Sequence, residues 1–176
     1  MIYFVRHGQT DWNLIAKLQG RVDNELNQTG INQAYALKDK LKKLKFDVVY
    51  CSPMKRARQT CEIIIDYKCD IFYDDRIIER DFGEFEGFKK TDFDYEGIWN
   101  SLKKQTFIKA ETVLNFEKRI FSLLDEINSK YKEKNILIVS HGGVVTIITC
   151  FFNGKPQNGD YLQFLVNTGD VQIFEN

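Results

Sequence analysis

The sequence is poor in histidine and has no excess of charge of either sign. His7 and His141 are its only histidines among 176 residues, and 25 Lys and Arg side chains balance 25 Asp and Glu side chains. Proteins that bind nucleic acids normally carry a strong basic excess, so this balance argues against a nucleic-acid partner. A small cationic pocket remains compatible with a net charge of zero.

Cysteine motifs and long apolar runs are also missing. No two of Cys51, Cys61, Cys69 and Cys150 have the Cys-x-x-Cys spacing of zinc ribbons and redox sites, which predicts small, buried thiols in a reducing compartment. No stretch approaches the roughly 20 apolar residues of a membrane helix. The apolar start, residues 1–5, is too short for a signal-peptide core. We therefore expect no membrane partner and a cytoplasmic location.

The pattern of apolar residues predicts alternating strands and helices in one domain spanning residues 1–176. Continuous apolar strands suit a parallel sheet that is covered on both faces, so we expect a three-layer α/β fold with a mostly parallel central sheet. Strands are expected at 2–5, 46–51, 71–73 and 135–140, with one or two more within 161–174. Helices are expected at 28–44, 53–67, 111–132 and from about 143 onward.

Two of the expected strands end in a histidine followed by glycine, at His7-Gly8 and at His141-Gly142-Gly143. Ligands bind at the carboxyl ends of parallel strands, and glycine allows the backbone to approach a ligand closely. A helix that begins near Gly143 would direct its N–H groups to the same place, which favours an anion. The alternative is that the two histidines are unrelated residues in turns.

Six sequence motifs carry a resemblance to a known family. The first is Arg6-His7-Gly8-Gln9-Thr10 followed by Trp12-Asn13, and the others lie at 19–23, 26–30, 51–60, 78–87 and 139–143. In this order they resemble the histidine phosphatase superfamily, in the branch that includes cofactor-dependent phosphoglycerate mutases. The resemblance covers most of the chain and implies a phosphoglycerate mutase-like fold.

The same resemblance implies a role for each matching residue. His7 matches the nucleophile that forms a phosphohistidine, a role that suits neutral imidazole near pH 7. Glu79 matches the proton donor to the leaving oxygen, which later activates water, whereas Glu84 and Glu86 are expected to be structural. The expected phosphate site has two parts: the main pocket is Arg6, Arg56 and His141, and further contacts come from Asn13, Gln19, Gly20 and Gly142. Arginine suits such a site because its planar fork can bind two phosphate oxygens.

The predicted activity is metal-independent hydrolysis of a small phosphomonoester, without a cofactor. Candidate substrates are α-ribazole phosphate and sugar phosphates. A cofactor-dependent phosphoglycerate mutase is the first alternative, disfavoured because similar mutases carry a longer insertion where this chain has only 88–110. A non-catalytic phospholigand-binding module is the second, disfavoured because Arg6, His7, Arg56, Glu79 and His141 are all retained.

Other phosphoryl-transfer mechanisms find no matching motif. No cysteine is followed by arginine at the spacing that a cysteine-based phosphatase requires, and the chain has neither a P-loop nor a Gly-x-Gly-x-x-Gly motif. The aromatic segment 88–107 has two interpretations, a short lid over the substrate or a cap on the core. The sequence does not indicate an oligomeric state.

Overall fold

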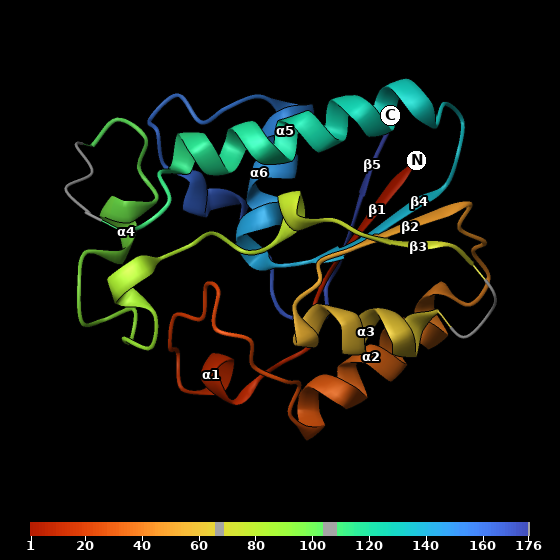
Figure 1. Cartoon of the computed structure of the whole chain (residues 1–176), viewed down its shortest axis with the longest axis horizontal. Helices are drawn as coiled ribbons and strands as arrows, with labels where there is room; N and C mark the ends of the chain where they lie inside the picture. Colours follow the sequence, from red (N-terminus) through yellow and green to blue (C-terminus); the bar gives the residue numbers. More distant parts are fainter. Residues whose placement is uncertain (66–68, 104–108, 176) are drawn as a thin grey trace.

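The fold is built on a central five-stranded sheet. The computed structural model describes residues 1–65, 69–103 and 109–175. The strands lie in the order β3-β2-β4-β1-β5, and all neighbours are parallel except β5, which is antiparallel to β1 (Figure 1). Their bounds are Ile2–Arg6 for β1, Val48–Cys51 for β2, Ile71–Tyr73 for β3, Ile136–Ser140 for β4 and Val171–Phe174 for β5.

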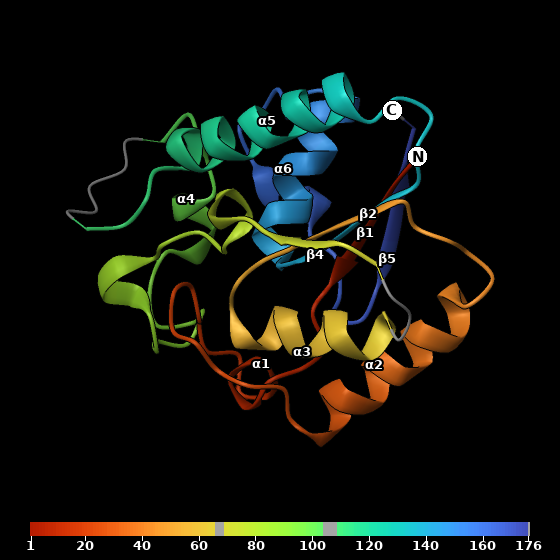
Figure 2. The same cartoon turned by 45° about the vertical axis from the view of Figure 1, so that its right-hand side comes forward.

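Two helical layers cover the two faces of this sheet, as Figures 1 and 2 show. Helices α5 (Val113–Lys130) and α6 (Gly142–Asn153) lie on one face, and α2 (Gln28–Leu41) and α3 (Lys55–Ile64) lie on the other. Alternation along β1 supplies both cores, because Ile2 and Phe4 pack on the α5–α6 side whereas Tyr3 and Val5 pack on the α2–α3 side. The expected three-layer, mostly parallel α/β fold is confirmed.

Short elements fill the connections between these layers. Helices α1 (Asp11–Leu14) and α4 (Tyr95–Ile98) lie at the side of the molecule where β1 and β4 end, and 3-10 turns span Asp75–Ile77, Gly83–Phe85 and Tyr161–Phe164. Asn27 caps α2 by accepting from the Gly30 N–H at 2.9 Å, as its sequence context predicts.

Some of the expected helix and strand boundaries were wrong. Helix α3 begins at Lys55 after an extended Met54, and it ends at Ile64 before an extended Ile65; residue 67 lies outside the described residues. Helix α2 ends at Leu41, short of 44, and α5 is shorter than expected at both ends. Residues 161–164 form a 3-10 turn, leaving β5 as the single strand of the C-terminal region.

Burial of the thiols was predicted correctly for three of the four cysteines. Cys51, Cys61 and Cys150 are buried and free, whereas Cys69 is free and only partly buried. Cys69 lies just before β3, an edge strand of the sheet, and packs against the core on the α2–α3 side. Within the described ranges, no helix combines the length and the apolar character needed to cross a membrane.

Candidate active site

The two histidines meet where β1 and β4 end side by side. Arg6 and Ser140 are register partners, and the His7 N–H donates to the Ser140 carbonyl at 2.9 Å. The next residue on each strand is a histidine, and the two rings pack edge to face with centroids 5.2 Å apart. His141 is also the N-cap of α6. The predicted juxtaposition at the carboxyl edge of the sheet is therefore present.

His7 is held in a form that suits nucleophilic attack. Its Nδ1 lies 2.7 Å from the Gly8 carbonyl oxygen, which can only accept, so Nδ1 carries the proton and Nε2 keeps its lone pair. Burial, followed by the charges of Arg56 and Arg6, holds the pKa of His7 well below its ordinary value. The imidazole is neutral at pH 7 as a result.

His141 is fixed from the opposite side by a hydroxyl. Its Nε2 lies 2.7 Å from Ser52 Oγ, on the turn between β2 and α3. Burial and then Arg56 lower its pKa well below the ordinary value, so this ring is also neutral at pH 7. Among the residues that the structure describes, its Nδ1 has no hydrogen-bond partner although it is buried.

Two arginines place positive charge around these rings. Arg56 is fully buried, and it donates to the carbonyls of Val22 at 2.8 Å and Gly20 at 2.9 Å. Arg6 donates to the Val166 carbonyl. Burial lowers the pKa of Arg6, and it lowers that of Arg56 to about 10, so both remain charged at neutral pH. In the described part of the chain each Nε is buried without a partner, which leaves both guanidinium groups with a donor to spare.

Glu79 is the carboxylate of this site, and hydrogen bonds hold it at both oxygens. Oε2 accepts from the Gly143 N–H at 3.2 Å and Oε1 from the Arg80 N–H at 2.9 Å. The Glu79 carbonyl accepts from Arg119, whose guanidinium also binds both oxygens of Glu111 at 2.8 and 3.0 Å. Helix α5 is thus connected directly to the segment that carries Glu79.

The paired glycines after His141 make room for this arrangement. A Cβ on Gly142 would lie 3.0 Å from Arg6 Cζ, and one on Gly143 would lie 2.4 Å from Glu79 Oε1. A side chain at either position would displace a charged group of the site. The glycines expected to allow close approach to a ligand therefore also allow close approach by the site's own side chains.

A pocket of about 450 Å³ opens at this edge of the sheet. Nearly all the residues predicted for the site line it: Arg6, His7, Asn13, Gln19, Gly20, Arg56, Glu79 and Gly142. His141 lies against His7 behind the lining. The Asn13 side-chain oxygen accepts from the Thr10 N–H at 3.0 Å, which leaves its amide nitrogen as a donor for the pocket. Glu86, for which a structural role is expected, accepts from the Arg21 and Phe82 N–H groups, and the lining includes neither Glu84 nor Glu86.

Several residues of the site escaped prediction. Lys17 and Lys90 line the pocket, and Ser52, Glu111 and Arg119 hold its charged groups in place. Ser52 adjoins Pro53 within a motif, but nothing in the sequence indicates that its hydroxyl meets a histidine 89 positions away. Lys17 and Lys90 offered no signal, because lysines are frequent and mostly exposed in this chain.

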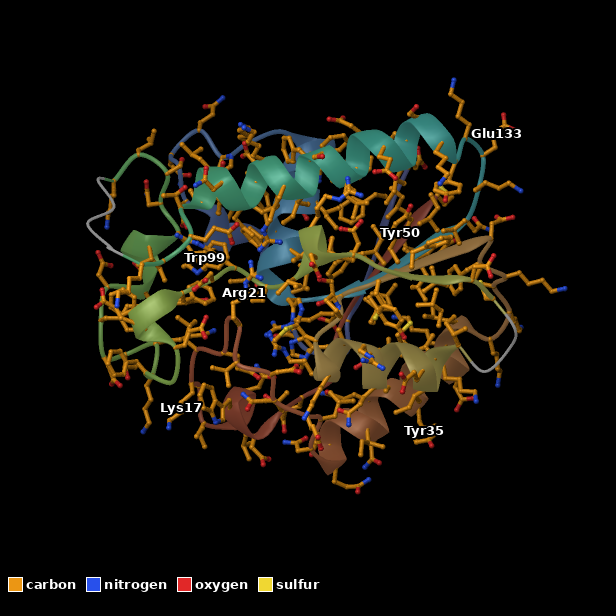
Figure 3. The ribbon with its side chains drawn as sticks, viewed as in Figure 1. Lys17, Arg21, Tyr35, Tyr50, Trp99 and Glu133 are labelled. Carbon is orange, nitrogen blue, oxygen red and sulfur yellow. The ribbon has the colours of Figure 1, made fainter. Side chains whose placement is uncertain are left out.

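Segment 88–107 has two interpretations, a lid over the substrate and a cap on the core. Its described residues bear on both. Trp99, which follows α4 (Figure 3), is 1% exposed and belongs to the core. It also lines the pocket. Tyr95 lines the pocket as well, and Phe93 stacks on Phe85 at 4.6 Å. Phe107 lies outside the described residues. The described part of this segment, residues 88–103, therefore contributes to the wall of the pocket and also caps the core.

A cationic pocket lies at the carboxyl edge of the parallel sheet, next to two buried histidines. This arrangement suits the binding of phosphate groups. Residues 2–175 match the histidine phosphatase superfamily (branch 1), and the chain belongs to that family. It is a phosphatase of small phosphorylated metabolites. Over 158 residues it is 35% identical to PhoE, an uncharacterized phosphatase of Bacillus subtilis (strain 168), covering 89% of this chain and 79% of PhoE.

Solved structures of two phosphatases have the same fold as this chain. A mutant phosphoserine phosphatase of Entamoeba histolytica in complex with phosphoserine matches with a TM-score of 0.84 and 26% identity, covering 97% of this chain and 87% of that one. The α-ribazole phosphatase of Shigella flexneri matches with a TM-score of 0.82 and 26% identity, with the same coverage. No group of three or more His, Cys, Asp or Glu side chains that could hold a metal ion occurs in 1–65, 69–103 or 109–175.

Proposed function

We propose that the chain hydrolyses phosphomonoesters without a metal, through a phosphohistidine on His7. The observation that carries this proposal is the 2.7 Å contact between His7 Nδ1 and the Gly8 carbonyl, which leaves a neutral Nε2 in a pocket lined by Arg6 and Arg56. A neutral imidazole nitrogen is a competent nucleophile, and the arginines stabilise charge on the phosphoryl oxygens during transfer.

The proposed reaction has two displacement steps. His7 Nε2 attacks phosphorus, the bond to the ester oxygen breaks, and Glu79 gives that oxygen a proton. Glu79 then takes a proton from water as the water oxygen attacks the phosphohistidine, which releases phosphate and restores neutral His7. Arg6, Arg56 and His141 bind the transferring group, and Asn13, Gln19, Gly20 and Gly142 supply further contacts.

Phosphate release in the presence of EDTA tests the activity. We expect the chain to release phosphate from members of a panel containing phosphoserine, 3-phosphoglycerate, α-ribazole phosphate and sugar phosphates. The His7→Asn variant, which keeps an N–H donor for the Gly8 carbonyl, should release none. Loss of the wild-type activity in EDTA would contradict metal independence.

The same assay decides between hydrolase and mutase. Only residues 88–112 join the Glu79 segment to α5, so we expect water to reach the phosphohistidine. Net phosphate release from 3-phosphoglycerate should exceed isomerisation, with or without 2,3-bisphosphoglycerate. Rapid isomerisation without phosphate release would show a mutase instead. Binding without turnover of any phosphomonoester would show a non-catalytic module.

We also propose that residues 1–176 form one histidine phosphatase domain that works in the cytoplasm. The family match over residues 2–175 supports the first statement. The four free cysteines support the second, because thiols persist in reducing compartments.

A further inference from the structure

The segment that carries Glu79 is irregular backbone. It follows the 3-10 turn Asp75–Ile77, which packs against α5 (Figure 1). Carbonyl groups that neither a helix nor a sheet pairs need other hydrogen-bond partners. Here a single side chain of α5 supplies them, because Arg119 donates to the Arg76 carbonyl at 2.6 Å and to the Glu79 carbonyl at 3.1 Å. Helix α5 therefore holds the backbone on which the proposed proton donor lies.

Contacts on and beside α5 hold Arg119 in turn. Its Cζ lies 4.6 Å from the centre of the Phe116 ring, which is fully buried in the core. Its Nε and Nη2 bind the two oxygens of Glu111 at 2.8 and 3.0 Å, in a pair whose side chains are only 18% and 14% exposed. The planar guanidinium can thus bind a carboxylate and two backbone carbonyls at the same time.

Glu111 binds the chain on the other side of Glu79. Its Oε2 accepts from the Asp81 N–H at 3.3 Å, and its own N–H donates to the Asp81 carbonyl at 2.8 Å. The Glu111 carbonyl accepts from Arg80 Nε at 2.7 Å. The two members of the ion pair therefore bind the backbone both before and after Glu79.

The position of the Glu79 carboxylate depends on this backbone. Its two oxygens accept from the main-chain N–H groups of Arg80 at 2.9 Å and Gly143 at 3.2 Å. Both donors belong to the backbone, so neither can follow a displaced carboxylate as a side chain would. A proton donor must lie within about 2.6–3.2 Å of the atom that receives the proton. A shift of the Glu79 backbone by roughly 1 Å would therefore impair the transfer.

We propose that Arg119, through its ion pair with Glu111, is the positioning residue of the general acid Glu79. This inference rests on the proposed function, in which Glu79 gives a proton to the leaving oxygen. Loss of Arg119 should slow the hydrolysis of esters whose leaving oxygen needs that proton. It should spare esters whose leaving group departs as a stable anion.

The test compares two leaving groups through kcat/KM, which covers the transfer of phosphate to His7. One substrate is p-nitrophenyl phosphate, whose phenolate leaves without a proton donor. The other is the alkyl phosphate of the panel above that the wild type hydrolyses fastest. We expect Arg119→Gln to lower kcat/KM about tenfold for the alkyl ester and no more than about twofold for p-nitrophenyl phosphate. A loss of folded protein would lower both values equally, so the ratio of alkyl to p-nitrophenyl kcat/KM separates positioning from stability.

Glu126→Gln is the matched control. Glu126 also lies on α5 and contacts the same turn, but it binds a side chain, Arg76 Nη2 at 2.8 Å, rather than the backbone of the Glu79 segment. Its loss removes an ion pair of α5 and should leave the ratio unchanged.

Two further variants examine the ion pair itself. Glu111→Gln should lower the ratio in the same direction as Arg119→Gln, and the double variant should lower it no further than Arg119→Gln alone, because the two side chains act as one unit. Arg119→Lys keeps the charge without the planar fork, so it should give a smaller fall. It also provides the measurement should Arg119→Gln not fold.

Failure of the positioning role is distinguishable from failure of the proposed function. Glu79→Gln should lower the same ratio more than Arg119→Gln does. A fall in Glu79→Gln with an unchanged ratio in the Arg119 variants would overturn the positioning role alone, and so would effects of Arg119→Gln and Glu111→Gln that multiply. An unchanged ratio in Glu79→Gln would overturn Glu79 as the general acid. Absence of hydrolysis of every ester, together with absence of phosphate on His7, would overturn the proposed function itself.

Discussion

His141 depends on a single hydroxyl for its position. Ser52 Oγ lies 2.7 Å from His141 Nε2, and it also accepts from the Met54 N–H at 3.4 Å, so it connects the start of α3 to the N-cap of α6. The ring has no other hydrogen bond within the described residues. Rotation of this ring would alter both its packing on His7 and its contact with a transferring phosphoryl group.

We expect Ser52→Ala to lower kcat/KM by about tenfold, less than the loss of a whole stabilising donor, because His141 stays present but is no longer oriented. The effect should fall mainly on kcat. Thr149→Ala is the matched control: it also removes a buried hydroxyl, one bonded only to a carbonyl within α6. That variant should lose stability but keep kcat/KM. Equal kinetics in the two variants would mean that Ser52 has only a structural role.

At the residue scale, the sequence predicted most of the charged groups that line the pocket but missed those that hold them in place. Arg6, His7 and His141 were predictable because they follow apolar strands and lie in recognisable motifs. Ser52, Glu111 and Arg119 act through contacts with residues far away in the chain, and no local pattern encodes such contacts. Only the packing of the loops against the strand ends brings these residues to the site.

At the scale of elements, α2 packs directly on the loop that holds His7. Gly30, in the first turn of α2, contacts the backbone of Gly8 and Gln9. A Cβ on Gly30 would lie 2.1 Å from the Gln9 carbonyl oxygen, and a Cβ on Gly8 would lie 2.4 Å from the Gly30 carbonyl oxygen. The two segments must therefore both lack side chains at this contact.

Gly30→Ala should lower the free energy of unfolding by about 2 kcal/mol or more, since the clash is with backbone that cannot rotate away. It should also lower kcat, because the Gly8 carbonyl that binds His7 Nδ1 belongs to the displaced loop. Chemical denaturation and steady-state kinetics measure the two effects. Thr29→Ala, at an exposed position next to Gly30, should change stability by no more than about 0.5 kcal/mol. Wild-type stability of Gly30→Ala would show that this contact tolerates a methyl group.

The presence of a helix or strand was easier to predict than the residues at which it begins and ends. Strands β1, β2, β3 and β4 and helices α2, α3, α5 and α6 follow from apolar periodicity. The ends depend on individual hydrogen bonds, such as the Asp160 side chain that accepts from the Leu162 N–H at 2.9 Å and favours a 3-10 turn over a strand. The antiparallel placement of β5 is set by its pairing with β1, which its own sequence does not encode.

At the scale of the whole molecule, a neutral protein surrounds a cationic centre with two buried, neutral histidines. The pKa values of His7 and His141 are both well below the ordinary value in the folded protein. In the unfolded chain both titrate near pH 6.5. Below that pH the unfolded state binds more protons than the folded state, so acid favours unfolding.

We expect the free energy of unfolding to fall between pH 6.5 and 5.5, with a slope of up to about 1.4 kcal/mol per pH unit for each histidine. Above pH 7.5 the two histidines should contribute no slope. Denaturant titrations over pH 5.5–8 measure this, and His7→Asn should remove about half of the acid slope. An unchanged slope in that variant would contradict burial of a neutral His7.

A covalent phosphate on His7 is the central feature of the proposed mechanism. Wild type and Glu79→Gln are mixed with p-nitrophenyl phosphate in EDTA, quenched in alkali and analysed by peptide mass spectrometry. p-Nitrophenolate leaves without a proton donor, so both proteins should form phosphohistidine. Glu79→Gln should accumulate more of it, because water is no longer activated. The phosphate should lie on the peptide containing His7, survive alkali and be lost in acid. Turnover with no phosphate on His7 in either protein would contradict the mechanism.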